Sequence, residues 1–398
     1  MKPLYKIAII VGITILVGAI VFFIWNSFVD TASPEPGSEL PVSTGGETGT
    51  SSLPVGEGGV KEPGEAGNPP AGGEGAVLTA RKISEYPVFD FSVSQDTKEV
   101  MYLGLDGKVF GAKEGPDVEI LGQTIDALNA IVPSPKGERV LASFGNPLSP
   151  QWGVFDTIDK VWRPLPRDVR NAAWGASDSE LLAISELNGK KSLVSVDFSK
   201  TPFAYKTLLK SFSFEDVVLS FRAPNELLFW ERTSAAYPGR LWQLDLKTAR
   251  LSLLSSLQNG FWLDWSRKGN LGFLYTTRDG FSIIDRNMRE IVPLFFSTFP
   301  NKCVANSTST AYCFVPKAAT LSNAVLPDDY LQNKLFTVDD LYYLDLEADS
   351  VEKVMEGGGG LPAIDAYSMG VTDGALYFLN RYDNGLYEIV LPSKNNTP

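Results

Sequence analysis

The segment FWLDWSRKGNLGFLYTT (261–277) indicates the kind of fold, because it joins two apolar runs through a short polar turn. Apolar runs of this length that flank a polar turn are typical of two antiparallel strands of a hairpin. The same pattern recurs along the chain, in segments that share the order apolar run, polar turn, apolar run: 89–103, 129–144, 171–187, 217–232, 302–315 and 364–381. The sequence therefore predicts a repeat of paired strands.

Two further strand-like runs lie between most copies, for example residues 192–198 and 205–209. Turn pairs that tolerate positive φ separate many of these runs: Asp106-Gly107, Asn188-Gly189, Asp279-Gly280, Asp373-Gly374 and Asn384-Gly385. No segment of comparable length has a sustained helical period. Four strands in each repeat of about 40–46 residues indicate β-propeller blades.

Seven copies divide residues 77–398 into repeats of 46 residues on average, so we expect an all-β, seven-bladed β-propeller, with six blades as the alternative. The last copy has only three strands and ends at residue 391. A strand at residues 77–83 precedes the first copy and belongs to no repeat. We expect this strand to close the ring as the outer strand of the last blade, because an open ring leaves sheet edges unpaired.

Three of the polar turns carry a family resemblance: VPSPKGERVL (132–141), AWGASDSELL (173–182) and DWSRKGNLG (264–272). They resemble the W/F-S-P-D-G-x-x-[LIV] repeat of the TolB-type, WD40-like propellers. The resemblance extends over 77–398 at low fidelity and implies a fold, since its motif is structural. Members of this family include periplasmic and surface scaffolds and the propeller caps of serine peptidases. This chain has no G-x-S-x-G motif and no α/β-hydrolase domain, which counts against a peptidase role.

Residues 1–30 predict a cytoplasmic stub and one transmembrane anchor helix. Residues 7–25 contain no charge and are nearly long enough to cross a hydrocarbon core of about 30 Å. Lys2 and Lys6 precede this run, so the positive-inside rule places the N-terminus in the cytoplasm and the propeller outside the cytoplasmic membrane. A cleaved signal peptide is the alternative, although its apolar core is usually shorter.

Residues 31–76 predict a disordered linker. They contain 12 Gly, 7 Pro and 7 Glu and no aromatic residue, so they offer no apolar surface for a core. A flexible chain of 46 residues spans about 40 Å on average. The domain boundaries that we expect are thus 1–30, 31–76 and 77–398.

The composition excludes several classes of function. The net charge is −12 and the chain has no histidine, which removes the Ser-His-Asp triad, the Cys-His pair and any zinc site with histidine ligands. The acidic balance makes a nucleic-acid partner unfavourable, and no cofactor or metal set is evident. We expect a non-enzymatic scaffold for an envelope or surface protein partner. The alternative is a hydrolase, or a carbohydrate- or calcium-binding propeller, that acts through its central channel.

The two cysteines, Cys303 and Cys313, lie in one predicted hairpin whose polar loop is centred near residue 308. Antiparallel pairing about that position places them opposite each other, so we expect a disulfide in an exported chain. Two buried, unpaired thiols are the alternative.

An insertion over residues 316–340 lengthens the sixth repeat and includes a predicted helical turn near Pro327. Extra loops on repeat proteins often mark a binding face. The candidate binding residues are Asp328, Asp329, Tyr330 and Gln332. The alternative interpretation is a solvated loop with one turn of helix.

Overall fold

The computed structural model describes residues 78–112, 115–200, 203–214, 216–223, 225–266, 270–358 and 363–392. The predicted anchor (1–30) and linker (31–76) lie outside the described residues. Within the described part of the chain, no helix is both long enough and apolar enough to cross a membrane.

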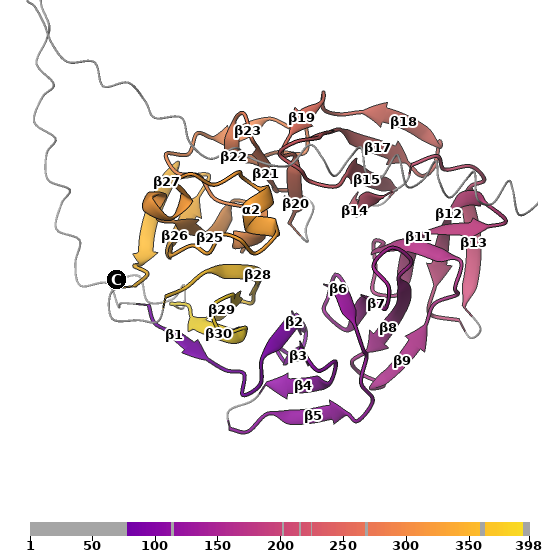
Figure 1. Ribbon diagram of the computed structural model, residues 1–398, viewed down its shortest axis with the longest axis horizontal. Helices are drawn as coiled ribbons and strands as arrows, with labels where there is room; N and C mark the ends of the chain where they lie inside the picture. The colour runs from indigo at the N-terminus through magenta and orange to yellow at the C-terminus, as the bar shows by residue number, and fades with distance from the viewer. Residues whose placement is uncertain are drawn as a thin grey trace, which may run out of the picture. The chain divides into compact units, whose positions relative to one another are not determined.

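Seven four-stranded antiparallel sheets surround a common axis, so the described part of the chain is a seven-bladed β-propeller (Figure 1). The seven sequence copies form the two innermost strands of the seven blades. The prediction of an all-β, seven-bladed fold is confirmed, and the six-bladed alternative is wrong. In each blade the first strand is innermost and the fourth lies at the rim.

The strands of the blades have the following bounds. Blade 1 contains β2 (Val88–Val93), β3 (Val100–Gly104), β4 (Val109–Ala112) and β5 (Val118–Leu121). Blade 2 contains β6 (Leu128–Pro133), β7 (Arg139–Phe144), β8 (Gln151–Asp156) and β9 (Val161–Pro164). Blade 3 contains β10 (Val169–Trp174), β11 (Glu180–Leu187), β12 (Lys190–Asp197) and β13 (Ala204–Leu209).

Blade 4 contains β14 (Val217–Ala223), β15 (Glu226–Glu231), β17 (Leu241–Asp245) and β18 (Arg250–Leu253), beside a small ladder of β16 (Pro238–Gly239) with β19 (Gln258–Asn259). Blade 5 contains β20 (Trp262–Trp265), β21 (Gly272–Thr276), β22 (Gly280–Ile284) and β23 (Glu290–Val292). Blade 6 contains β24 (Cys303–Ala305), β25 (Thr310–Pro316), β26 (Asp339–Asp345) and β27 (Ser350–Met355). Blade 7 contains β28 (Ala366–Val371), β29 (Ala375–Asn380), β30 (Gly385–Val390) and β1 (Ala80–Lys82).

Antiparallel order gives the propeller two distinct faces. We call upper the face with the loops from second to third strand and the connections between blades. The lower face has the turns from first to second and from third to fourth strand. The tight turn between β11 and β12 shows how the sequence builds such loops: Asn188 (φ 51°) and Gly189 (φ 73°) are both left-handed, as a type I′ hairpin requires.

Blade 7 closes the ring with strands from both ends of the propeller. β1 pairs antiparallel with β30, with Ala80 opposite Ile389 and Lys82 opposite Tyr387. Arg81 forms an ion pair with Glu388 of β30 at 2.7 Å, and Lys82 forms one at 2.8 Å with Asp383 in the turn that precedes β30. The predicted closure by the N-terminal strand is confirmed.

The core lies mainly between neighbouring blades. One buried cluster joins blades 3 and 4 and includes Leu182, Leu193, Leu227 and Phe229. Another joins blades 6 and 7, where the centroids of the Phe314 and Phe378 rings are 4.6 Å apart. Trp174, Trp230 and Trp265 are buried in such contacts between neighbouring blades.

The inner strands also meet at the closing joint. Asp90 in β2 accepts a hydrogen bond of 2.5 Å from the hydroxyl of Ser368 in β28, and its Oδ1 also accepts the backbone N–H of Phe91. Burial raises the pKa of Asp90 to about 6, although these two hydrogen bonds act in the opposite direction.

Removal of β1 should destabilise the whole propeller, because it exposes the edge of β30 and removes Leu78 and Ala80 from the apolar contacts of blade 7. We expect a chain that starts at residue 86 to melt at least about 4 °C below one that starts at residue 77, which corresponds to roughly 2 kcal/mol. Thermal unfolding followed by circular dichroism measures the difference. Equal melting temperatures would show that β1 does not close the ring.

Asp90→Asn should change how stability depends on pH. The folded-state pKa of about 6 lies above the ordinary value of 3.8, so the folded state binds this proton more tightly than the unfolded state does. The stabilisation from that proton is complete below pH 3.8 and is lost as the pH rises through about 6. The melting temperature of the wild type relative to Asp90→Asn should therefore fall between pH 4 and pH 7, and parallel curves would contradict the assignment.

Candidate functional site

The insertion of blade 6 lies on the upper face, between β25 and β26. It contains the 3₁₀ turn η2 (Ala318–Leu321) and the single-turn helix α2 (Asp328–Leu331), while the 3₁₀ turn η1 (Pro300–Lys302) lies just before β24. The helical turn expected near Pro327 is therefore present. All four candidate binding residues lie in or directly after α2.

The two candidate aspartates hold the insertion in place. Asp328 accepts hydrogen bonds from the backbone N–H of Ala235 (2.7 Å) and from the hydroxyl of Ser234 (3.4 Å), both in the upper loop of blade 4. Asp329 accepts the backbone N–H of Val325 at 2.7 Å within the insertion itself. These carboxylates thus already serve structural contacts, whereas Gln332 is exposed.

Tyr330 is an anchor of the insertion, with only 2 % of its surface exposed. Its ring stacks on Phe299 with 4.4 Å between the ring centroids. The guanidinium carbon of Arg381, a residue on the upper loop of blade 7, lies 4.2 Å from the centroid of the Tyr330 ring. Burial raises the pKa of the Tyr330 hydroxyl. This side chain is therefore buried within the protein and is not displayed to a ligand.

A sealed cluster of charged side chains lies next to Tyr330. The ammonium group of Lys302 lies 2.5 Å from Oδ2 of Asp339 and 2.7 Å from Oδ1 of Asp365, and all three side chains are fully buried. Arg381 adds an ion pair to Asp365 at 3.1 Å. Thr337 donates its backbone N–H to Asp365 at 3.0 Å. Two positive and two negative charges therefore balance.

The cluster shifts the pKa values of its members. Burial alone acts to lower the pKa of Lys302, but the charges of Asp339 and Asp365 outweigh it and hold the pKa above its ordinary value. Burial raises the pKa of Asp339, although the charge of Lys302 opposes this shift. Close pairing of these charges thus offsets part of the cost of removing them from water.

The sequence gives no sign of this cluster. Lys302, Asp339 and Asp365 are up to 63 residues apart, and they meet only because adjacent blades bring the start of β24, the start of β26 and the start of β28 to the same upper edge. The pair Asp339-Asp340 is visible in the sequence as adjacent carboxylates, but no local pattern links it to Lys302.

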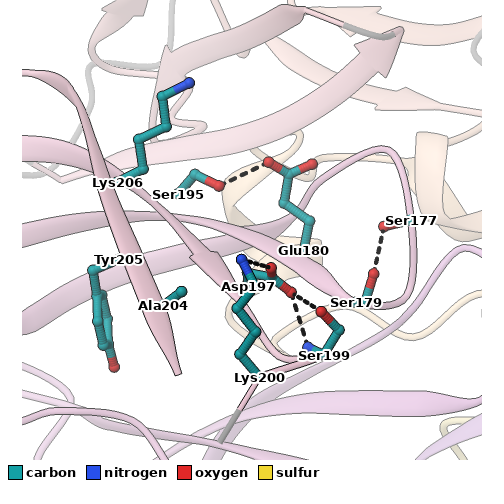
Figure 2. A pocket seen from close by; sticks show the side chains of 10 residues that line it. All are labelled: Ser177, Ser179, Glu180, Ser195, Asp197, Ser199, Lys200, Ala204, Tyr205 and Lys206. Carbon is teal, nitrogen blue, oxygen red and sulfur yellow. Dashed lines mark hydrogen bonds and ion pairs between the residues drawn. The ribbon is translucent and has the colours of Figure 1, made fainter. Parts of the chain in front are cut away.

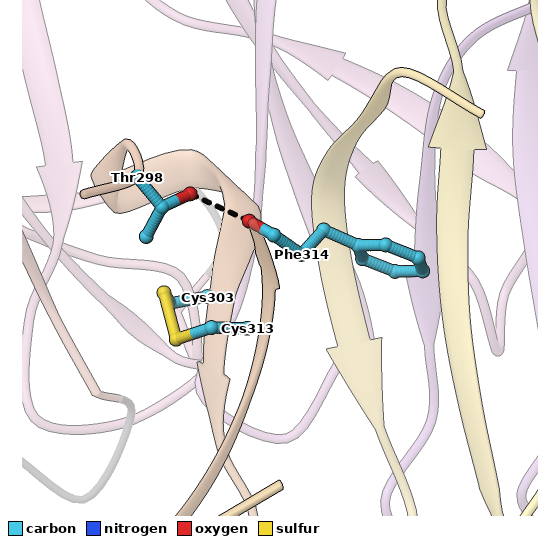
Figure 3. Close-up of a disulfide and its surroundings, with 4 residues drawn as sticks. All are labelled: Thr298, Cys303, Cys313 and Phe314. Carbon is cyan, nitrogen blue, oxygen red and sulfur yellow. Dashed lines mark hydrogen bonds between the residues drawn. A yellow bond between two sulfur atoms is a disulfide. The ribbon is translucent and has the colours of Figure 1, made fainter. Parts of the chain in front are cut away.

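Cys303 and Cys313 form a disulfide and lie directly opposite each other on β24 and β25 (Figure 3). Their Cα atoms are 4.2 Å apart. Phe314 follows Cys313 and points to the other side of the sheet, into the contact with blade 7 (Figure 3). The structure therefore has the expected bridge, one residue after the buried Lys302.

A polar hollow opens at the lower end of blade 3 (Figure 2). Its polar groups are largely paired with one another. Ser195 donates to Glu180 at 2.7 Å, and the hydroxyl of Ser199 donates to Asp197 at 2.6 Å. Because these groups already satisfy each other, the hollow does not point to a particular ligand.

The central channel is lined by the first strand of each blade. In the described parts of these strands, the carboxylates are Asp90 and Asp264. Within the described ranges, no three Cys, Asp or Glu side chains gather as a metal site would require. The exposed residues of the inner strands include Val132 and Val218, which are apolar.

Exposed apolar side chains gather on the upper face. Leu148, Tyr237 and Phe295 are the most exposed, at 95 %, 76 % and 74 %. The loops and connections of this face present the following large apolar residues: Tyr86, Leu105, Leu148, Tyr237, Leu257, Phe295, Val325, Leu331, Phe336 and Tyr382. Among described residues, the turns of the lower face present Ile158. The two faces therefore differ in how many exposed large apolar side chains their described loops present.

The fold is similar to solved propellers at low sequence identity. Oligogalacturonate lyase from Vibrio parahaemolyticus has a TM-score of 0.52 at 10% identity over 79% of this chain and 97% of the lyase. An oligogalacturonate lyase in complex with manganese has the same score and identity, with 91% of that chain covered. A chain of the mitotic checkpoint complex has a TM-score of 0.51 at 11% identity over 86% of this chain and 99% of that chain.

These similarities establish the propeller fold and do not extend to activity. No family model matches the sequence, and no curated protein matches it.

Tyr330→Ala should destabilise the protein strongly, while Gln332→Ala should have little effect. Truncation of a buried aromatic ring typically costs about 3–5 kcal/mol, whereas an exposed substitution usually changes stability by less than about 0.5 kcal/mol. Thermal or urea unfolding of both variants measures the contrast. Equal stability of the two variants would show that Tyr330 does not anchor the insertion.

Proposed function

We propose that this protein is a membrane-tethered, extracytoplasmic propeller that binds an envelope or surface protein through its upper face. The observation that supports this function is the concentration of exposed apolar side chains on one face. Aromatic side chains such as Tyr and Phe are enriched in the core of protein interfaces relative to the rest of the protein surface.

The course of the chain supports this orientation. β1 runs antiparallel to β30, so the chain enters the propeller at the lower face before Ala80 and leaves it at the lower face after Val390. The upper face is thus opposite the point of attachment of the proposed linker and anchor. A linker of about 40 Å reach leaves this face accessible to a protein partner.

The proposed partner presents an apolar docking surface with few charges. Leu148, Tyr237 and Phe295 lie on the upper loops of blades 2, 4 and 5, and they would bury against apolar side chains of the partner. A partner that is mainly charged would leave these side chains without a complement.

Site-specific photocrosslinking in cells that produce the full chain tests the proposal. A benzophenone amino acid at Tyr237 or Phe295 should give a discrete crosslinked envelope protein, and the same group at Ile158 on the lower face is the matched control. Leu148→Ser with Phe295→Ser should abolish the product from position 237 without lowering the melting temperature, because these side chains are exposed.

Three outcomes would contradict the proposal. Equal products from positions 237 and 158 would show that the upper face has no special role. Crosslinks to lipid alone would replace the protein partner with a membrane surface. Protease applied to intact cells should cut within 31–76 and release the propeller, and release only after rupture of the cytoplasmic membrane would invert the proposed orientation.

A further inference from the structure

The buried Lys302 has no role in the proposed docking surface, and its environment is unusual for a lysine. Its side chain is fully buried, as are those of Asp339 and Asp365. Lysine is almost never fully buried unless it is paired, and here it faces two carboxylates at once. The ring of Tyr330, whose centroid is 5.1 Å from the ammonium nitrogen, lies over the site.

The carboxyl group of Asp339 is held as an electrophile would be. Its Oδ2 accepts Lys302 at 2.5 Å and the backbone N–H of Ala366 at 2.9 Å. Its Oδ1 accepts the hydroxyl of Thr337 at 2.7 Å. When Lys302 itself acts as the nucleophile, the Ala366 N–H on Oδ2 and the Thr337 hydroxyl on Oδ1 remain to stabilise the negative charge that develops as it adds to the carbonyl carbon.

The second carboxylate lies where a proton relay would be needed. Oδ1 of Asp365 accepts Lys302 at 2.7 Å and lies 2.9 Å from the Thr337 hydroxyl oxygen, whose single proton is shared between Asp365 and Asp339. Arg381 holds the other oxygen of Asp365 at 3.1 Å. Asp365 can therefore take a proton from Lys302 and pass it through the Thr337 hydroxyl towards Asp339.

We propose that Lys302 and Asp339 form an intramolecular amide bond between Nζ and the side-chain carbonyl carbon. The neutral amine of Lys302 adds to that carbon, the C–N bond forms, one C–O bond of the protonated carboxyl breaks, and one water molecule leaves. In total, the ammonium group loses two protons, and these combine with the oxygen that leaves the carboxyl group to form the water molecule. No oxidant, reductant or other reactant is needed.

The buried site favours this condensation. Nucleophile and electrophile are held in contact, which replaces a bimolecular encounter. The reaction removes one positive and one negative charge from a fully buried site and leaves Asp365 paired with Arg381. Burial also raises the pKa of Asp339 and so favours its neutral acid form. The pKa of Lys302 is raised as well, so the neutral amine is the minor form and the reaction is slow.

The bond would fasten the insertion at its base. It would join the residue before β24 to the first residue of β26, across the segment that contains α2. The disulfide Cys303–Cys313 already joins β24 to β25, so the first three strands of blade 6 would be covalently linked. This inference is independent of the proposed docking function.

Intact-mass measurement of the folded, fully reduced protein tests the bond. The wild type should be lighter than its sequence by the mass of one water molecule, and Lys302→Met and Asp339→Ala should have their full sequence masses. Peptide mapping should find one branched peptide that joins Lys302 to Asp339. The internal control is the ion pair of Lys317 with Asp340 in the same insertion, in which the charged atoms are 3.5 Å apart and Lys317 is partly exposed. This pair should remain unlinked.

Asp365→Asn tests the relay separately. This variant should have the full sequence mass or form the bond much more slowly, while its circular dichroism spectrum shows that the propeller is folded. A full sequence mass for the folded wild type would overturn the proposal and leave an ionic cluster only. A bond from Lys302 to Asp365 would overturn the assignment of Asp339.

Discussion

Closure of the ring is the constraint on which the rest of this structure depends. The pairing of β1 with β30 gives blade 7 its fourth strand and removes the free edge that an open ring would leave. Because blades pack against their neighbours, the buried clusters between them are complete only in a closed ring. The contact of Asp90 with Ser368 continues this closure on the inner strands.

Closure also determines what each face can do. Since β1 enters from the lower face, the long upper loops are free of both ends of the described chain. The insertion of blade 6 uses this space and reaches over blades 4 and 7 through Asp328 and Tyr330. Its aspartates and its tyrosine contribute contacts within the protein, while the exposed apolar residues around it form the surface that we propose for a partner.

The sixth blade concentrates the unusual chemistry of the molecule. A disulfide, a buried lysine and two buried aspartates all lie near the start of β24 and the base of the insertion. Such a cluster costs desolvation energy that an apolar core would not, so its charges must be paired closely. The proposed amide bond would remove part of that cost by converting one ion pair into a neutral linkage.

The architecture of the propeller could be predicted from the sequence. A strand, a turn and a second strand form a local pattern, so the spacing of FWLDWSRKGNLGFLYTT and its copies predicted the seven blades. The incomplete last blade predicted the closing strand. The positions of Cys303 and Cys313 on either side of one turn predicted their pairing. Only the tertiary structure decided which polar residues meet. Lys302, Asp339 and Asp365 lie on different strands of two blades, and the burial of Tyr330, a residue that the sequence suggested for ligand binding, follows from packing against Phe299 and Arg381. Local patterns report the period of a strand, but they contain no information on which side chains neighbouring blades bring together.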